Sequence, residues 1–115
     1  MRSIVIPPQI TLRSPETGET LIAISFEMIL KRLMANPLWA ETFKAMKSQL
    51  SIERAWEKGE NPFVIAEEDW VNLKRAAEDP RMATGDHVVA GLGFYPQLSS
   101  QLVPYLAAII DAAQV

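Results

Sequence analysis

The sequence lacks cysteine altogether and contains a single histidine, His87. Disulfides, thiolate metal sites and cysteine nucleophiles are therefore excluded, and one imidazole supplies too few ligands for a transition-metal site. We expect no metal and no cofactor. The absence of cysteine is also compatible with a reducing cytoplasm.

The chain also lacks a basic excess and a long apolar run. Its formal net charge is -3, whereas a general nucleic-acid binder carries surplus positive charge. The longest apolar run, Leu102–Ile110, contains Pro104 and is too short to span a membrane. The few residues before Pro7 and Pro8 do not resemble a signal peptide. We therefore expect a cytoplasmic protein that binds neither nucleic acid nor membrane.

What is present is enough apolar sequence for one domain. The chain has 115 residues, of which 49% are hydrophobic, so we expect a single domain over residues 1–115. Residues 1–25 predict a β-hairpin, because two short apolar segments, 9–13 and 20–24, flank a turn that contains Pro15 and Gly18.

Residues 26–115 predict a helical part. Apolar spacing and capping residues indicate helices over 26–35, 37–58, 67–79 and from Ser99 or Ser100 to about residue 113. A short extended piece is expected at 63–65 and an irregular region at 81–93. The expected fold class is α+β and mostly α, with an N-terminal β-hairpin packed on a bundle of about four helices.

The predicted second helix carries two patterns. An apolar stripe is expected to face the core and comprises Trp39, Phe43, Met46 and Leu50. Its charged residues alternate in sign, which is typical of a solvated face with ion pairs four residues apart. These residues are Lys44, Lys47, Arg54 and Lys58 with Glu41, Glu53 and Glu57. Trp56 lies off the stripe and either packs on the Phe63 segment or is an exposed anchor for a partner.

Asp86, His87 and Tyr95 are the candidate catalytic or ligand-binding residues. His87 follows a carboxylate that could orient it as a general base, but no serine lies in a nucleophile-elbow pattern. A loop histidine after a capping aspartate is the simpler interpretation. Glu67, Glu68 and Asp69 are interpreted as the negatively charged first turn of a helix and not as a cation site.

Candidate protein-interaction residues lie in three places. Ile22 and Ile24 lie on one face of the predicted hairpin while Leu21 and Ala23 lie on the other, so one layer of helices cannot cover both. Phe94 and Tyr95 follow a glycine-rich stretch, and aromatic side chains are enriched at interface centres. Trp56 is the third. The bland alternative is that helices wrap the hairpin completely.

The order of segments along the chain resembles a class of small bacteriophage-encoded accessory proteins for virion and tail assembly. The segments that carry this resemblance are 8–19, 25–30, 36–39, 67–73 and 102–106. The resemblance implies a non-enzymatic protein that binds a virion component and has no catalytic residues.

We therefore expect a non-enzymatic protein-binding or assembly factor. Its partner would be a virion component or a second copy in a homo-oligomer, in the producing or host cell or in the virion. One alternative is a small phage-type inhibitor of a host enzyme or defence protein. Another is a small enzyme or ligand-binding domain that uses Asp86, His87 and Tyr95.

Overall fold

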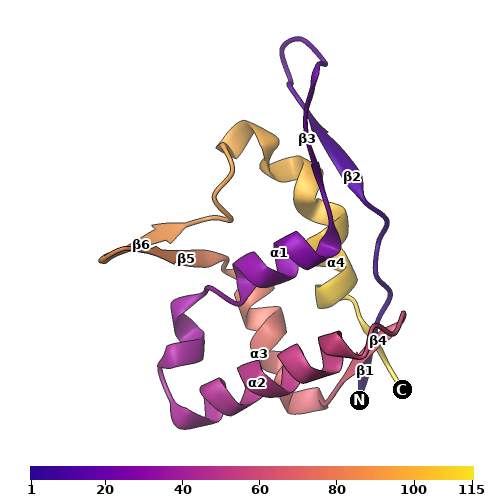
Figure 1. Cartoon of the computed structure of the whole chain (residues 1–115), viewed down its shortest axis with the longest axis vertical. Coiled ribbons are helices and arrows are strands. Elements are labelled where there is room, and N and C mark those ends of the chain that lie inside the picture. The colour runs from indigo at the N-terminus through magenta and orange to yellow at the C-terminus, as the bar shows by residue number, and fades with distance from the viewer.

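A three-stranded sheet brings the two ends of the chain together. The computed structural model describes residues 1–115, and its first strand, β1 (Arg2–Ile4), lies between β4 (Phe63–Ile65) and β7 (Ala113–Gln114). Both neighbours are antiparallel to β1. The amide of Val115 donates to the carbonyl of Met1 at 2.9 Å, and the two termini lie side by side (Figure 1).

The predicted β-hairpin is present but is only one of three small sheets. Strands β2 (Ile10–Arg13) and β3 (Thr20–Ile24) pair with Leu12 opposite Ile22. Gly18, at a φ of 73°, lies in the turn between them, and its amide donates to the Ser14 carbonyl at 2.8 Å. The hairpin extends away from the helices as a long arm (Figure 1).

A second hairpin lies in the region expected to be irregular. Strands β5 (Arg81–Thr84) and β6 (His87–Ala90) pair across a two-residue turn of Gly85 and Asp86. Gly85 has the positive φ of 58° that such tight turns use. This hairpin projects from the body beside α1 (Figure 1).

Four α-helices and two 3₁₀ helices complete the chain. Helix α1 (Phe26–Leu33) is capped by Ser25, whose hydroxyl accepts from the Met28 amide at 3.3 Å. The others are η1 (Pro37–Ala40), α2 (Phe43–Glu57), α3 (Glu67–Glu78), η2 (Pro96–Leu102) and α4 (Val103–Ile110).

The expected long helix over 37–58 is therefore two elements. Thr42 adopts an extended backbone, and its hydroxyl accepts from the Ala45 amide at 3.0 Å. A threonine in this conformation caps a new helix instead of continuing the previous one. Likewise, Ser99 and Ser100 belong to η2 and not to the last α-helix.

The expected fold, an N-terminal hairpin on a helical bundle, is wrong. The structure is an α+β fold with four α-helices and seven strands distributed over small sheets. The first strand does not join the hairpin. It pairs instead with β4 and β7, which lie about sixty residues and more than a hundred residues away in the chain. The core includes the fully buried side chains of Ile4, Phe26, Trp39, Phe63, Leu73 and Tyr105.

Candidate protein-interaction site

Helix α2 turns its large apolar side chains toward solvent. Phe43, Met46 and Leu50 are 73%, 48% and 46% exposed. They share one face because residues three and seven positions apart lie on the same side of a helix. We call these three residues the apolar crest.

The buried face of α2 is made of smaller residues. Ala45, Ser48 and Ile52 are buried there, and the Ser48 hydroxyl accepts from the Asn72 side-chain amide of α3 at 3.1 Å. The expectation that Phe43, Met46 and Leu50 face the core is therefore wrong. The break at Thr42 detaches Trp39 from this helix, so the apolar stripe inferred across the break does not exist.

Charged side chains continue the outward face of α2 toward its C-terminal end in two rows, of which only Lys47 lies level with the crest. The basic row consists of Lys47, Arg54 and Lys58, and the acidic row consists of Glu53 and Glu57. None of the five ion pairs in the structure involves either row. The expected ion pairs along this helix are therefore absent, and Glu53 and Glu57 instead form a like-charge pair four residues apart, as do Arg54 and Lys58.

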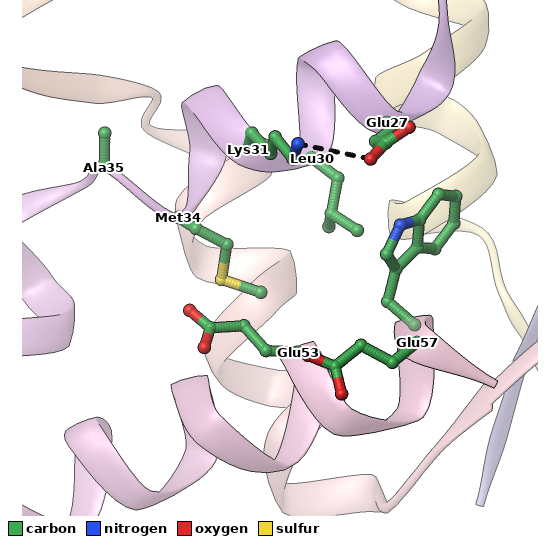
Figure 2. A pocket seen from close by; sticks show the side chains of 8 residues that line it. Glu27, Leu30, Lys31, Met34, Ala35, Glu53 and Glu57 are labelled. Carbon is green, nitrogen blue, oxygen red and sulfur yellow. Dashed lines mark ion pairs between the residues drawn. The ribbon is translucent and has the colours of Figure 1, made fainter. Parts of the chain in front are cut away.

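A pocket of about 570 Å³ opens between α1 and α2 beside the acidic row. Figure 2 shows Leu30 and Met34 projecting toward α2, with Glu53 and Glu57 opposite them. Glu27 completes the acidic rim but is already bound to Lys31 at 3.2 Å. The Glu53 and Glu57 carboxylates have no such partner. The pocket therefore combines an apolar floor with two free negative charges.

Trp56 both supports and lines this pocket. Its indole packs edge to face on Phe63 with ring centroids 5.5 Å apart, and it also meets Phe26 at 5.8 Å. The first of the two alternatives for Trp56, packing on the Phe63 segment, is confirmed. The remaining exposed part of the side chain lies on the pocket wall.

A second hollow of similar size lies on the other side of α2. It is lined by all three residues of the basic row, together with Leu50 and residues of β4 such as Val64. No acidic side chain lines it. Helix α2 thus separates an acidic hollow from a basic one.

Family models, curated proteins and solved structures were each compared with this chain, and none matches. None of the helices has the length and apolar character needed to span a bilayer.

The two hairpin residues predicted to meet a partner differ in their exposure to solvent. Ile24 is only 1% exposed and belongs to the core, so it is unavailable to another protein. Ile22 is 44% exposed and lies beside exposed Leu21. Tyr105 explains this difference in exposure, because its hydroxyl accepts from the Ile10 amide and fastens the base of the hairpin to α4.

Phe94 and Tyr95 also have different surroundings. The Arg32 guanidinium stacks over the Phe94 ring at 4.1 Å and donates to the Leu92 carbonyl at 2.6 Å. Phe94 is therefore partly buried in packing within the chain. Tyr95 is exposed and lines a small hollow near the β2–β3 turn.

Asp86 and His87 lie at the tip of the β5–β6 hairpin, and both are exposed. No hydrogen bond joins their side chains, and the hollow lined by Tyr95 includes neither of them. The arrangement expected of a general base held by a carboxylate is not seen at this position. The geometry gives the catalytic alternative no support.

The acidic start of α3 has a structural partner. Arg2 donates from Nε and Nη2 to the two Glu67 carboxylate oxygens at 2.8 and 2.9 Å, and from Nη1 to the Ala112 carbonyl at 3.0 Å. This hydrogen bonding holds the pKa of Glu67 below its ordinary value. The Arg2 guanidinium also lies 3.8 Å from the Trp70 ring centroid. No group of three or more acidic or histidine side chains is arranged to hold a metal ion.

Proposed function

We propose that this chain is a non-enzymatic protein-binding factor that uses the outward side of α2. The observation that carries the proposal is the apolar crest of Phe43, Met46 and Leu50, which is exposed between two hollows of opposite charge. Exposed apolar side chains that cluster on one helix face and are rimmed by charge are typical of protein interfaces.

The composition of the site favours a protein ligand over a small molecule. Both hollows are open to solvent along a helix about 22 Å long, a length that suits a helix or extended segment. Methionine adapts to different partner shapes, and Met34 and Met46 lie on the pocket wall and crest. Trp56 supplies an aromatic group of the kind that dominates binding energy at interface centres.

The setting we propose is bacteriophage virion or tail assembly. The support for this setting is the resemblance in segment order along the chain. This resemblance implies a protein that binds a virion component, and we place protein contacts on the exposed apolar residues of α2.

A photoreactive amino acid placed at Leu50 tests the proposal. Benzoylphenylalanine at this position should form a covalent adduct with a protein after irradiation of cells that express the chain. The matched control is Val103 on α4, which is 55% exposed and lies outside both hollows. A protein adduct at position 50 and none at 103 supports the proposal. No adduct at position 50, or equal labelling at both positions, contradicts it.

A further inference from the structure

The order of the three rows around α2 carries information about the partner. Each residue advances about 100° around a helix, so Arg54 and Lys58 lie toward the β4 side of α2 and Glu53 and Glu57 toward its α1 side, in the turns that follow the crest. The lining residues agree, because the basic row lines the hollow with Val64 and the acidic row lines the pocket with Leu30. The outward face is therefore apolar in its N-terminal half, and in its C-terminal half it is basic on one flank and acidic on the other.

Within one chain neither row forms an ion pair. Like charges four residues apart on a helix repel, and here this applies to Glu53 with Glu57 and to Arg54 with Lys58. No ion pair within the chain offsets either repulsion. A partner that neutralises both rows must present positive charge to one flank of α2 and negative charge to the other.

A second copy of the chain meets this requirement in one orientation only. When two identical helices pack in parallel about a twofold axis, the left flank of one faces the right flank of the other. The basic row of each copy then faces the acidic row of its partner, and the crests pack on each other in the N-terminal half of the contact. In the antiparallel orientation, basic would face basic and acidic would face acidic.

We infer that the chain forms a parallel twofold dimer through the outward face of α2. This inference rests on the proposed function, because it names the occupant of the same site. The contact is one helix of 15 residues against its copy, so the buried area falls near the lower end for specific interfaces. The dimer should therefore be concentration-dependent and weakened by salt.

Single cysteines determine the orientation, because the chain has none of its own. In the parallel dimer every crest residue faces its counterpart, so Phe43→Cys and Leu50→Cys should each form a disulfide-linked dimer under mild oxidation. Both should react about tenfold faster than Val103→Cys, because association raises the local thiol concentration. In an antiparallel pair only Leu50, at the middle of α2, would cross-link. That result would overturn the inference.

Charge reversal tests the pairing of the rows. Glu53→Lys/Glu57→Lys and Arg54→Glu/Lys58→Glu should each raise the dimer dissociation constant about tenfold or more, because each places like charges opposite one another across residues 53–58. An equimolar mixture of the two variants should recover the dimer. Glu16→Lys/Glu19→Lys, on the exposed β2–β3 turn, makes the same charge change as the first variant and should dimerise normally.

The outcomes separate the two proposals. A purified chain that stays monomeric while position 50 labels a different protein overturns the dimer and leaves the proposed function standing. A monomer without any adduct at position 50 overturns both. All the exchanged residues are exposed, and circular dichroism of each variant verifies that the fold is retained.

Discussion

The hydroxyl of Tyr105 on α4 accepts a hydrogen bond from the backbone amide of Ile10 at 3.1 Å. The same hydroxyl donates toward the carbonyls of Pro8 and Ile24, at 2.9 and 3.0 Å. Tyr105 is fully buried, and burial raises the pKa of its phenol. One side chain thus joins both strands of the β2–β3 hairpin to the helical part of the molecule.

Replacing Tyr105 by phenylalanine should lower the free energy of unfolding by about 1–3 kcal/mol. The substitution keeps the ring but leaves the Ile10 amide and two carbonyls without their partner, and unpaired buried polar groups are costly. Urea unfolding measures the change. The matched control is Tyr95→Phe, an exposed tyrosine without a hydrogen bond from its hydroxyl, which should stay within about 0.5 kcal/mol of the wild type.

Two isoleucines on β3 should differ in how far aspartate destabilises the chain. Ile24→Asp places a carboxylate in the core and should destabilise the chain by about 3 kcal/mol or more. Ile22→Asp, on an exposed site two residues away, should change stability by less than about 1 kcal/mol. Thermal unfolding compares them. Similar losses for both would contradict the burial pattern of this hairpin.

The ion pair between Arg2 and Glu67 should make stability sensitive to acid. Because the folded pKa of Glu67 lies below its unfolded value, its contribution is fully present above the unfolded pKa and disappears as the pH falls through the folded one. Glu67→Gln should therefore be less stable than the wild type at neutral pH, and the difference should shrink below about pH 4.

Unfolding of both proteins between pH 3 and 7 measures this difference. Glu68→Gln is the matched control, since Glu68 is exposed beside Glu67 and forms no ion pair. A stability difference that stays constant with pH would contradict the assignment of the effect to the Arg2–Glu67 pair.

Local features of the fold were predictable from the sequence. The turn at 14–19, the Ser25 cap and the strand at 63–65 follow from residues within a few positions of one another. The three-stranded sheet was not predictable from the sequence, because β1 has three residues and pairs with segments far along the chain. Apolar periodicity does not reveal such pairing.

The site was misjudged for a local reason. Phe43, Met46 and Leu50 have the spacing of a core stripe, so the sequence predicted that they face the core together with Trp39. Where α2 packs closely on α3, the buried positions hold the small residues Ala45 and Ser48. Which face of α2 is buried therefore depends on the position of α3. The pattern located an amphipathic helix correctly but inverted its two faces. The like-charge pairs at 53–57 and 54–58 were the available signal that this face lacks the ion pairs expected along it.

The solution mass of the purified protein over a range of concentrations tests the central claim most directly. Light scattering should show a mass that rises from 12.8 kDa toward twice that value as concentration increases. Leu50→Asp should remain at the mass of one chain, and Val103→Asp should behave like the wild type. A wild-type protein that stays at one chain mass at every concentration, or a Leu50→Asp variant that associates as the wild type does, would contradict the account.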